Sequence, residues 1–103
     1  MTTTHVCLTL VANREFRQEL FDYLSEQMDG VPGFTASDAA GHGPTVRLPS
    51  AAERVRGHAD RVLVRIILEE RAAHRLVERL RAAFAGAHLV YWAAPVTSFG
   101  VID

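Results

Sequence analysis

Residues 60–68 read Asp-Arg-Val-Leu-Val-Arg-Ile-Ile-Leu, and this stretch decides the fold. Apolar side chains occupy every second position from Val62 to Leu68, while arginines and further apolar residues alternate in the positions between them. An apolar period of two predicts a β-strand. This is the most clearly patterned strand in the chain, and the other elements are placed outward from it.

The segment before this strand is a long loop at about residues 41–59, which reads GHGPTVRLPSAAERVRGHA. Loops longer than about 12–15 residues are uncommon in compact domains and are usually functional or disordered. This loop holds three of the seven glycines, two of the five histidines and three arginines of the chain. Inside it, Ser50 and Glu53 have the spacing of a capping box, which predicts a short helix over about 51–56. We therefore expect the binding chemistry to lie here.

Two helices and three further strands complete the pattern. An apolar residue at every fourth position predicts a first amphipathic helix. Asn13 is its expected N-cap, and Asp29-Gly30 is its expected end. A second amphipathic helix begins at Glu69-Glu70 and ends at Gly86. The remaining strands are predicted by alternation, with the last ended by Pro95, and they cover residues 5–12, 33–40 and 88–94.

The order β-α-β-β-α-β predicts an α+β, ferredoxin-like fold. Right-handed crossovers place both helices on one face of a four-stranded antiparallel sheet. The other face is then too apolar for water and too polar for a closed core, which favours self-association. Its residues are Cys7, Thr9, Leu63, Arg65, Ile67, Val90 and Trp92. We expect a homo-oligomer packed through this open face.

Composition limits the class of protein. A chain of 103 residues has room for one domain, here residues 1–103 with the 41–59 loop as part of it. Its net charge of −1 argues against electrostatic capture of nucleic acid, and no apolar run is long enough to insert in a membrane. The start has no signal-peptide pattern and Cys7 is the single cysteine, so a cytoplasmic location is expected. The absence of lysine excludes Schiff-base and Walker-lysine chemistry.

The fold pattern and several short motifs resemble a known group, the PII-like signalling proteins. These proteins are βαββαβ units with a long loop between the second and third strands. Within that superfamily the chain looks like one bacterial family often encoded beside heavy-metal efflux pumps. The motifs that carry the resemblance are Gly33-Phe34-Thr35, Gly41-His42-Gly43, Glu53-Arg54-Val55-Arg56-Gly57, and Tyr91-Trp92 with Pro95-Val96 and Gly100.

The resemblance spans about residues 5–101 and implies a homotrimer with an exposed loop and clefts between its subunits. It implies a regulatory role in metal tolerance and signal transduction, without catalysis, and a partner such as a membrane transporter. Nitrogen-regulatory members of the superfamily hold nucleotide phosphates with a Gly- and Lys-rich loop. The corresponding stretch here, Ala82 to His88, has Gly86 and His88 but no lysine, so ATP binding in the familiar manner is not implied.

Two sets of loop residues are candidates for an effector site. His42 and His58 stand at the two stems, which a β-hairpin brings together, and Glu53 is a candidate third ligand. Imidazole is a natural ligand for Zn, Cu, Ni or Co. The simpler interpretation is that both histidines are exposed polar loop residues, because this spacing alone does not define a metal site.

The second set is a candidate anion clamp for a nucleotide or another phosphate-bearing molecule. Arg54 and Arg56 supply guanidinium groups, and Arg47 and Arg61 lie near the same stems. The backbone N–H groups next to Gly41, Gly43 and Gly57 can approach a bound anion closely. The alternative is that these arginines pair with nearby carboxylates, such as Glu53 or Asp60, and bind nothing.

No catalytic constellation is present, so we expect a non-enzymatic regulator whose 41–59 loop responds to a divalent metal or a phosphate-bearing molecule. Two alternatives stay open. One is a dimeric ferredoxin-like enzyme of the small monooxygenase kind. The other is a structural oligomerisation module. The oligomeric state distinguishes the dimeric enzyme from the trimeric regulator.

Overall fold

The computed structural model describes residues 4–27, 31–44 and 46–103. The described elements follow the predicted order, with a short helix between the second and third strands. They are β1 (His5–Asn13), the 3-10 turn η1 (Arg14–Phe16), α1 (Arg17–Glu26), β2 (Thr35–Gly41), α2 (Ala51–Arg56), β3 (Ala59–Glu69), α3 (Glu70–Ala83) and β4 (Val90–Val96).

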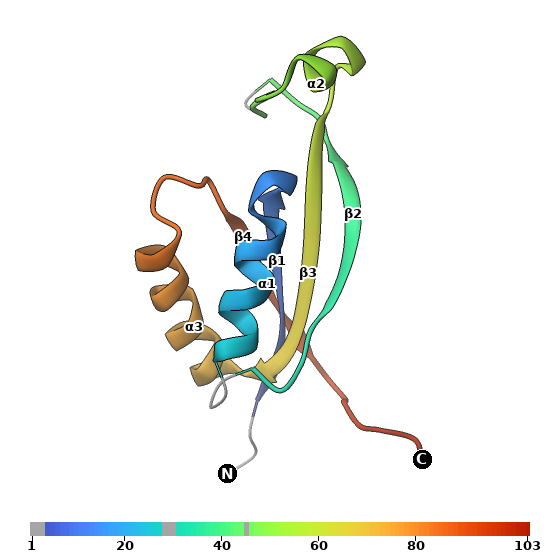
Figure 1. Cartoon of the computed structure of the whole chain (residues 1–103). Coiled ribbons are helices and arrows are strands. Elements are labelled where there is room, and N and C mark those ends of the chain that lie inside the picture. The colour runs from blue at the N-terminus through green and yellow to red at the C-terminus, as the bar shows by residue number, and fades with distance from the viewer. Residues whose placement is uncertain (1–3, 28–30, 45) are drawn as a thin grey trace.

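The strands form one antiparallel sheet in the order β2-β3-β1-β4. Helices α1 and α3 lie side by side on one face of it (Figure 1). The best-patterned strand, β3, pairs with both β1 and β2 and is therefore central. The predicted α+β, ferredoxin-like architecture with both helices on one side is confirmed.

The hydrophobic core lies between the sheet and the two helices. The strands contribute alternate side chains to it, and the helices contribute residues three or four apart, as their apolar stripes predict. Its fully buried large side chains are Leu8, Leu10, Leu20, Leu24, Val62, Val64, Ile66 and Leu76. These side chains fix the sheet as a rigid platform for the loop at its end.

The strand register confirms the composition of the open face. Thr9 lies opposite Arg65 on β3 and opposite Trp92 on β4, so the three side chains form one row across the sheet. Thr9 is buried in this row, while Arg65 and Trp92 are exposed. The face is thus partly apolar and uncovered in the single chain.

Several element ends differ from the sequence prediction by one to three residues. The last strand was expected to end at Pro95, but β4 continues through it to Val96. Proline lacks the N–H that a strand donates and is tolerated on an edge strand, which is where β4 lies. The predicted end of the first long helix, Asp29-Gly30, lies outside the described residues, and α1 itself ends at Glu26.

The predicted loop stands away from the helix-covered body. The molecule is 51 Å long, and β2 and β3 extend beyond the other strands and carry α2 at one end (Figure 1). Since β2 ends at Gly41 and β3 begins at Ala59, the connection covers residues 42–58. Within the described ranges, no helix is long and apolar enough to cross a membrane.

Candidate functional site

The outer part of the loop is organised by a capping box around α2. The Ser50 hydroxyl accepts a hydrogen bond from the Glu53 N–H at 3.1 Å, and the Glu53 carboxylate accepts one from the Ser50 N–H at 3.2 Å. Gly57 ends the helix in the left-handed conformation, with φ 79°, and donates its N–H to the Glu53 carbonyl at 2.8 Å. Glycine adopts that conformation without a steric penalty. The predicted helix over 51–56 is confirmed.

Glu53 also ties α2 to the start of β3. Its second carboxylate oxygen accepts a hydrogen bond from the Asp60 N–H at 2.7 Å, and the residue is only 6% exposed. This hydrogen bond, followed by the one from Ser50, lowers the pKa of the Glu53 carboxyl below its usual 4.5. The carboxylate is a structural acceptor for backbone N–H groups.

The two loop histidines lie together at the base of the loop. Gly41 pairs with Ala59 at the end of the hairpin, and the rings of His42 and His58 follow with their centroids 5.4 Å apart and their planes at 48°. The Nδ1 atom of His58 is buried and has no hydrogen-bond partner among the described residues. The hairpin therefore brings this predicted pair into contact.

Glu53 does not join the histidines as a third metal ligand. Both of its oxygens bind backbone N–H groups of the loop instead. In the part of the chain that the structure describes, no group of three or more His, Cys, Asp or Glu side chains could hold a metal ion. The metal-ligand set predicted from the sequence is thus reduced to His42 and His58.

The predicted arginine clamp is engaged inside the loop. Arg54 donates to the Leu48 carbonyl at 3.2 Å, and Arg56 forms an ion pair of 2.6 Å with Asp60. The Arg56 contact is of the kind the alternative interpretation predicts, pairing with a carboxylate, whereas Arg54 binds a backbone carbonyl. Exposed pairs of this kind contribute about 0–1 kcal/mol, so they order the loop only weakly.

Gly41 and Gly43, which were predicted to let backbone N–H groups approach an anion, have roles in packing and in a turn. A Cβ at Gly41 would lie 2.8 Å from Nε and 3.2 Å from Cγ of Arg61, a buried side chain that covers this position. Gly43 accepts a hydrogen bond from the Val46 N–H at 3.3 Å in the turn after His42. Gly41 is therefore fixed by the close approach of Arg61.

A polar cleft that the sequence did not predict lies between the loop and the body. It has a volume of about 370 Å³ and is lined by three segments that are far apart in sequence. Its polar side chains include Asn13 at the end of β1, Arg47 in the loop, and His88 before β4. Asn13 was predicted as a helix N-cap and does precede η1, but its side chain forms no capping hydrogen bond.

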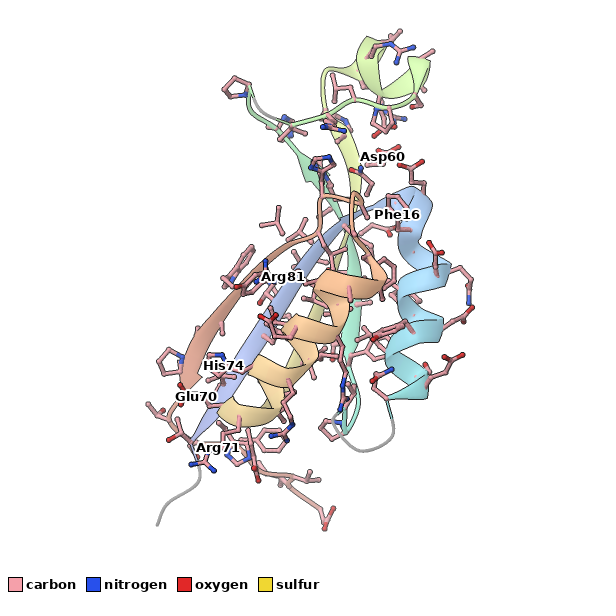
Figure 2. All side chains as sticks on the ribbon, turned by 90° about the vertical axis from the view of Figure 1, so that its left-hand side faces the viewer. Phe16, Asp60, Glu70, Arg71, His74 and Arg81 are labelled. Carbon is pink, nitrogen blue, oxygen red and sulfur yellow. The ribbon has the colours of Figure 1, made fainter. Side chains whose placement is uncertain are left out.

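Asn13 makes this cleft a candidate binding site. The residue is 7% exposed, and its Oδ1 atom has no hydrogen-bond partner among the described residues. A smaller adjoining pocket of about 190 Å³ reaches Glu53 and Asp60. Figure 2 shows Asp60 at the same end of the molecule as Phe16, the last residue of η1. The hydrogen-bonded base of the loop thus borders the cleft directly.

The comparison with protein families identifies the chain. The family described as "Protein of unknown function (DUF3240)" matches residues 2–103. The chain belongs to the DUF3240 family. A DUF3240 protein from Shewanella baltica has a solved structure with a TM-score of 0.79 and 18% identity, and the match covers 100% of both chains. A comparison with curated proteins gave no match.

Solved structures described as PII-like share the fold. A putative PII-like signalling protein from Thermus thermophilus has a TM-score of 0.64 and 19% identity, covering 91% of this chain and 88% of that one. A nitrogen regulatory PII-like protein, CPII, from Thiomonas intermedia has a TM-score of 0.69 and 16% identity, covering 96% and 97%. That structure is described as bound to ADP, AMP and bicarbonate. This DUF3240 chain therefore has a PII-like fold.

Proposed function

We propose that this DUF3240 protein is a non-catalytic, PII-like regulator whose 41–59 loop responds to a small effector. The contact between His42 and His58 at the base of the loop is the observation that carries the proposal. The similarity in fold to proteins described as signalling and nitrogen regulatory supports it. The proposed switch is a change in the order of the loop when an effector binds.

The first candidate effector is a divalent transition-metal ion. Two imidazoles whose centroids are 5.4 Å apart can turn one nitrogen each toward a shared ion, and imidazole suits Zn, Cu and Ni. The unpartnered Nδ1 of His58 is available for this bond among the described residues. Water or a partner protein supplies the remaining ligands. Such an ion would fix the stem after β2 against the stem before β3.

A phosphate-bearing molecule in the Asn13 cleft is the second candidate. Arg47 lines this cleft and supplies the guanidinium that a phosphate would pair with. The unpartnered Oδ1 of Asn13 is an acceptor and suits a hydroxyl or N–H donor elsewhere on such a molecule. The ADP and AMP bound to CPII favour this alternative at the level of the fold. Of the predicted clamp arginines, Arg47 is the proposed anion-binding group, because Arg54 and Arg56 bind Leu48 and Asp60 instead.

The proposed assembly is a cytoplasmic homotrimer formed through the open face of the sheet. The exposed Trp92 and Val90 on this face, beside the half-buried Ile67, support self-association. The loop lies beyond the helix-covered part of the sheet (Figure 1) and is free to contact a further protein. We propose a membrane transporter of the metal-efflux kind as that partner.

Isothermal titration calorimetry tests the effector. Zn(II), Cu(II), Ni(II) and Co(II) are titrated into the protein, and ATP, ADP and AMP are titrated separately. We expect metal binding in the wild type that is lost in His42→Ala and His58→Ala. His74→Ala is the matched control, because His74 is an exposed histidine on α3, and it should bind as the wild type does.

The nucleotide titrations decide between the two candidate effectors. Binding of a nucleotide that is weakened in Arg47→Gln and unchanged in His58→Ala favours the Asn13 cleft. No binding of any metal or nucleotide would contradict the switch. A dimer that retains a chromophore would favour the small monooxygenase alternative.

A further inference from the structure

Strand β4 is the most exposed apolar element of the sheet. Val90, Tyr91 and Trp92 are between 47% and 51% exposed, and the strand carries no charged residue. Soluble proteins usually protect an edge strand with charge or a cover. The opposite edge, β2, follows that rule, because Asp38 on it pairs with Arg14 at 3.5 Å.

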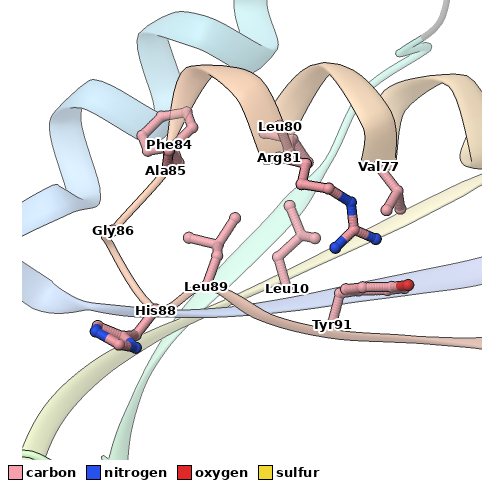
Figure 3. A pocket seen from close by; sticks show the side chains of 10 residues that line it. All are labelled: Leu10, Val77, Leu80, Arg81, Phe84, Ala85, Gly86, His88, Leu89 and Tyr91. Atoms are coloured by element: carbon pink, nitrogen blue, oxygen red, sulfur yellow. The ribbon is translucent and has the colours of Figure 1, made fainter.

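A groove runs between β4 and α3. It consists of two pockets of about 250 and 320 Å³ that share Val77 and Tyr91 in their walls. Figure 3 shows Leu10 and Leu89 directed into the first pocket, with Arg81 reaching from α3 toward Tyr91. Ala93 and Pro95 line the second pocket. The groove is therefore apolar along the strand, with an arginine at one end.

The segment after β4 has exposed apolar side chains of its own. Phe99, Val101 and Ile102 are 60%, 80% and 101% exposed. Within its own chain this segment leaves on the side away from α3 (Figure 1), where Phe99 stacks on His5 with centroids 6.1 Å apart. It does not enter the groove beside its own β4.

We propose that residues 97–103 of one copy lie antiparallel along β4 of a second copy and fill its groove. The lengths match, because Phe99 to Asp103 and Pro95 to Tyr91 each span about 13 Å as extended chain. In this register Val101 lies opposite Ala93. Alternate side chains, Phe99 and Val101, enter the groove, and Ile102 packs beside Trp92 on the open face. The added strand covers the edge of β4.

Charge selects the antiparallel direction. Asp103 is the only charged residue of the segment, and the antiparallel register places it at the Tyr91 end, where Arg81 lies. The reverse direction would place Asp103 at the other end of the groove, near the Glu70 carboxylate. Glu78 lies beside Arg81, with Oε1 3.6 Å from the Arg81 Nε, and does not distinguish the two directions. Figure 2 shows Glu70 and Arg81 at opposite ends of α3, on the side that faces β4.

This contact is heterologous, since the tail of one copy meets the groove of another. Such contacts close into rings when the rotation between copies allows it. At its Tyr91 end the groove shares Gly86 and His88 with the Asn13 cleft, and the proposed contact covers β4 from Tyr91 to Pro95. The inference does not depend on which effector the loop binds.

Disulfide formation between two separately purified variants tests the contact. Ala93→Cys and Val101→Cys are each made in a Cys7→Ser background, mixed and oxidised. Non-reducing electrophoresis should show a disulfide-linked heterodimer. The matched control, Val55→Cys mixed with Ala93→Cys, should not show one, although Val55 is 88% exposed. Absence of the first heterodimer, or equal yield in the control, would overturn the proposal.

Two further variants distinguish the occupants of the groove. The double variant Ala93→Cys/Val101→Cys on one chain should still link two chains, and a disulfide closed within one chain would show that the chain's own tail fills the groove. Adding Phe99→Asp and Ile102→Asp to the Val101→Cys chain should reduce the heterodimer at least about tenfold, because charge in an apolar groove is unfavourable. Val55→Asp should leave the yield unchanged. An unchanged yield of heterodimer with the tail variant would contradict the proposal. Metal binding measured by calorimetry should be the same in all these chains, because His42 and His58 are unaltered in them.

Discussion

The loop at residues 42–58 and the β4 edge are both exposed, yet they leave very different groups uncovered. In the loop, Glu53, Arg54 and Arg56 all bind partners within the loop or at the start of β3. At the β4 edge, Tyr91 and Trp92 are half exposed beside an apolar groove. The loop thus engages these three charged side chains, whereas the edge leaves its hydrophobic surface open.

This difference indicates which kind of partner each region suits. The loop retains a few unpartnered polar atoms among its described residues and their neighbours, notably Nδ1 of His58 and Oδ1 of Asn13. A few directed polar atoms suit an ion or a small molecule. A continuous apolar strip suits a protein surface, here a second copy of the chain. The predictions below test this division of roles.

The largest expected effect is loss of assembly on substitution of Trp92. Aromatic anchors at the centre of an interface contribute about 2–4 kcal/mol, so Trp92→Asp should weaken self-association roughly 30- to 1,000-fold. Sedimentation equilibrium measures this change. Val55→Asp is the control, because Val55 is an even more exposed apolar residue that lies on α2, away from the open face, and this variant should assemble as the wild type does. Equal masses for all three proteins would contradict the open-face assembly.

Gly41→Ala should have the next largest effect, on the stability of the hairpin that carries the loop. The added Cβ meets buried Arg61 at 2.8 Å, and overpacking of this kind costs about 1–2 kcal/mol. Thermal unfolding should therefore occur several degrees lower, at about 4–8 °C per kcal/mol for a small domain. Gly100→Ala meets no neighbouring atom and should leave the midpoint unchanged. A Gly41→Ala midpoint equal to that of the wild type would show that Arg61 moves aside freely.

Ser50→Ala should loosen α2 while the sheet stays intact. Loss of the capping hydroxyl costs about 1 kcal/mol, which corresponds to roughly fivefold faster amide exchange in the 51–57 segment. Hydrogen exchange followed by mass spectrometry resolves this segment from β4. Ser25→Ala is the control, because Ser25 is an exposed residue on α1, and the 51–57 segment should exchange in this variant as it does in the wild type. Faster exchange throughout the sheet would argue against the loop as a separate unit.

Acid should produce the mildest change, again confined to the loop. The pKa of Glu53 is lowered from 4.5 mainly by the Asp60 N–H, so its contribution is complete above about pH 4.5 and is lost as pH falls through the lower folded value. The effect is small because a protonated carboxyl still accepts a hydrogen bond. The Ser50 amide signal in NMR should shift below pH 4.5 in the wild type and not in Glu53→Gln, because the Ser50 N–H donates to the Glu53 carboxylate. A shift centred above pH 4.5 would contradict the sign of this pKa change.

The fold could be predicted because its signals are local. Strand alternation and the helical apolar stripes are each read within about ten residues, and they gave the correct order of elements. The predicted end of β4 was two residues too early. A strand tolerates Pro95 only at the edge of a sheet, and which strand lies at the edge is a property of the whole sheet, not of the local sequence. The pairing of His42 with His58 followed from the hairpin alone.

The candidate site was only partly predictable because several of its groups depend on tertiary contacts. The sequence assigned Glu53 both to a capping box and to a metal site. The hydrogen bond from the Asp60 N–H, which occupies the second carboxylate oxygen of Glu53, joins α2 to β3 and could not be predicted from a local pattern. The Asn13 cleft joins Asn13, Arg47 and His88, and no local pattern links three such distant residues. The groove beside β4 is likewise formed only when α3 packs on the sheet.

The central claim is that the loop responds to an effector bound at its base. Amide hydrogen exchange measured with and without Zn(II) tests this claim most directly. The account predicts slower exchange in residues 41–59 when Zn(II) is added, no change in β4, and no response of the loop in His58→Ala. A loop whose exchange is unaffected by Zn(II), or slows equally in His58→Ala, would contradict the metal-responsive base formed by His42 and His58.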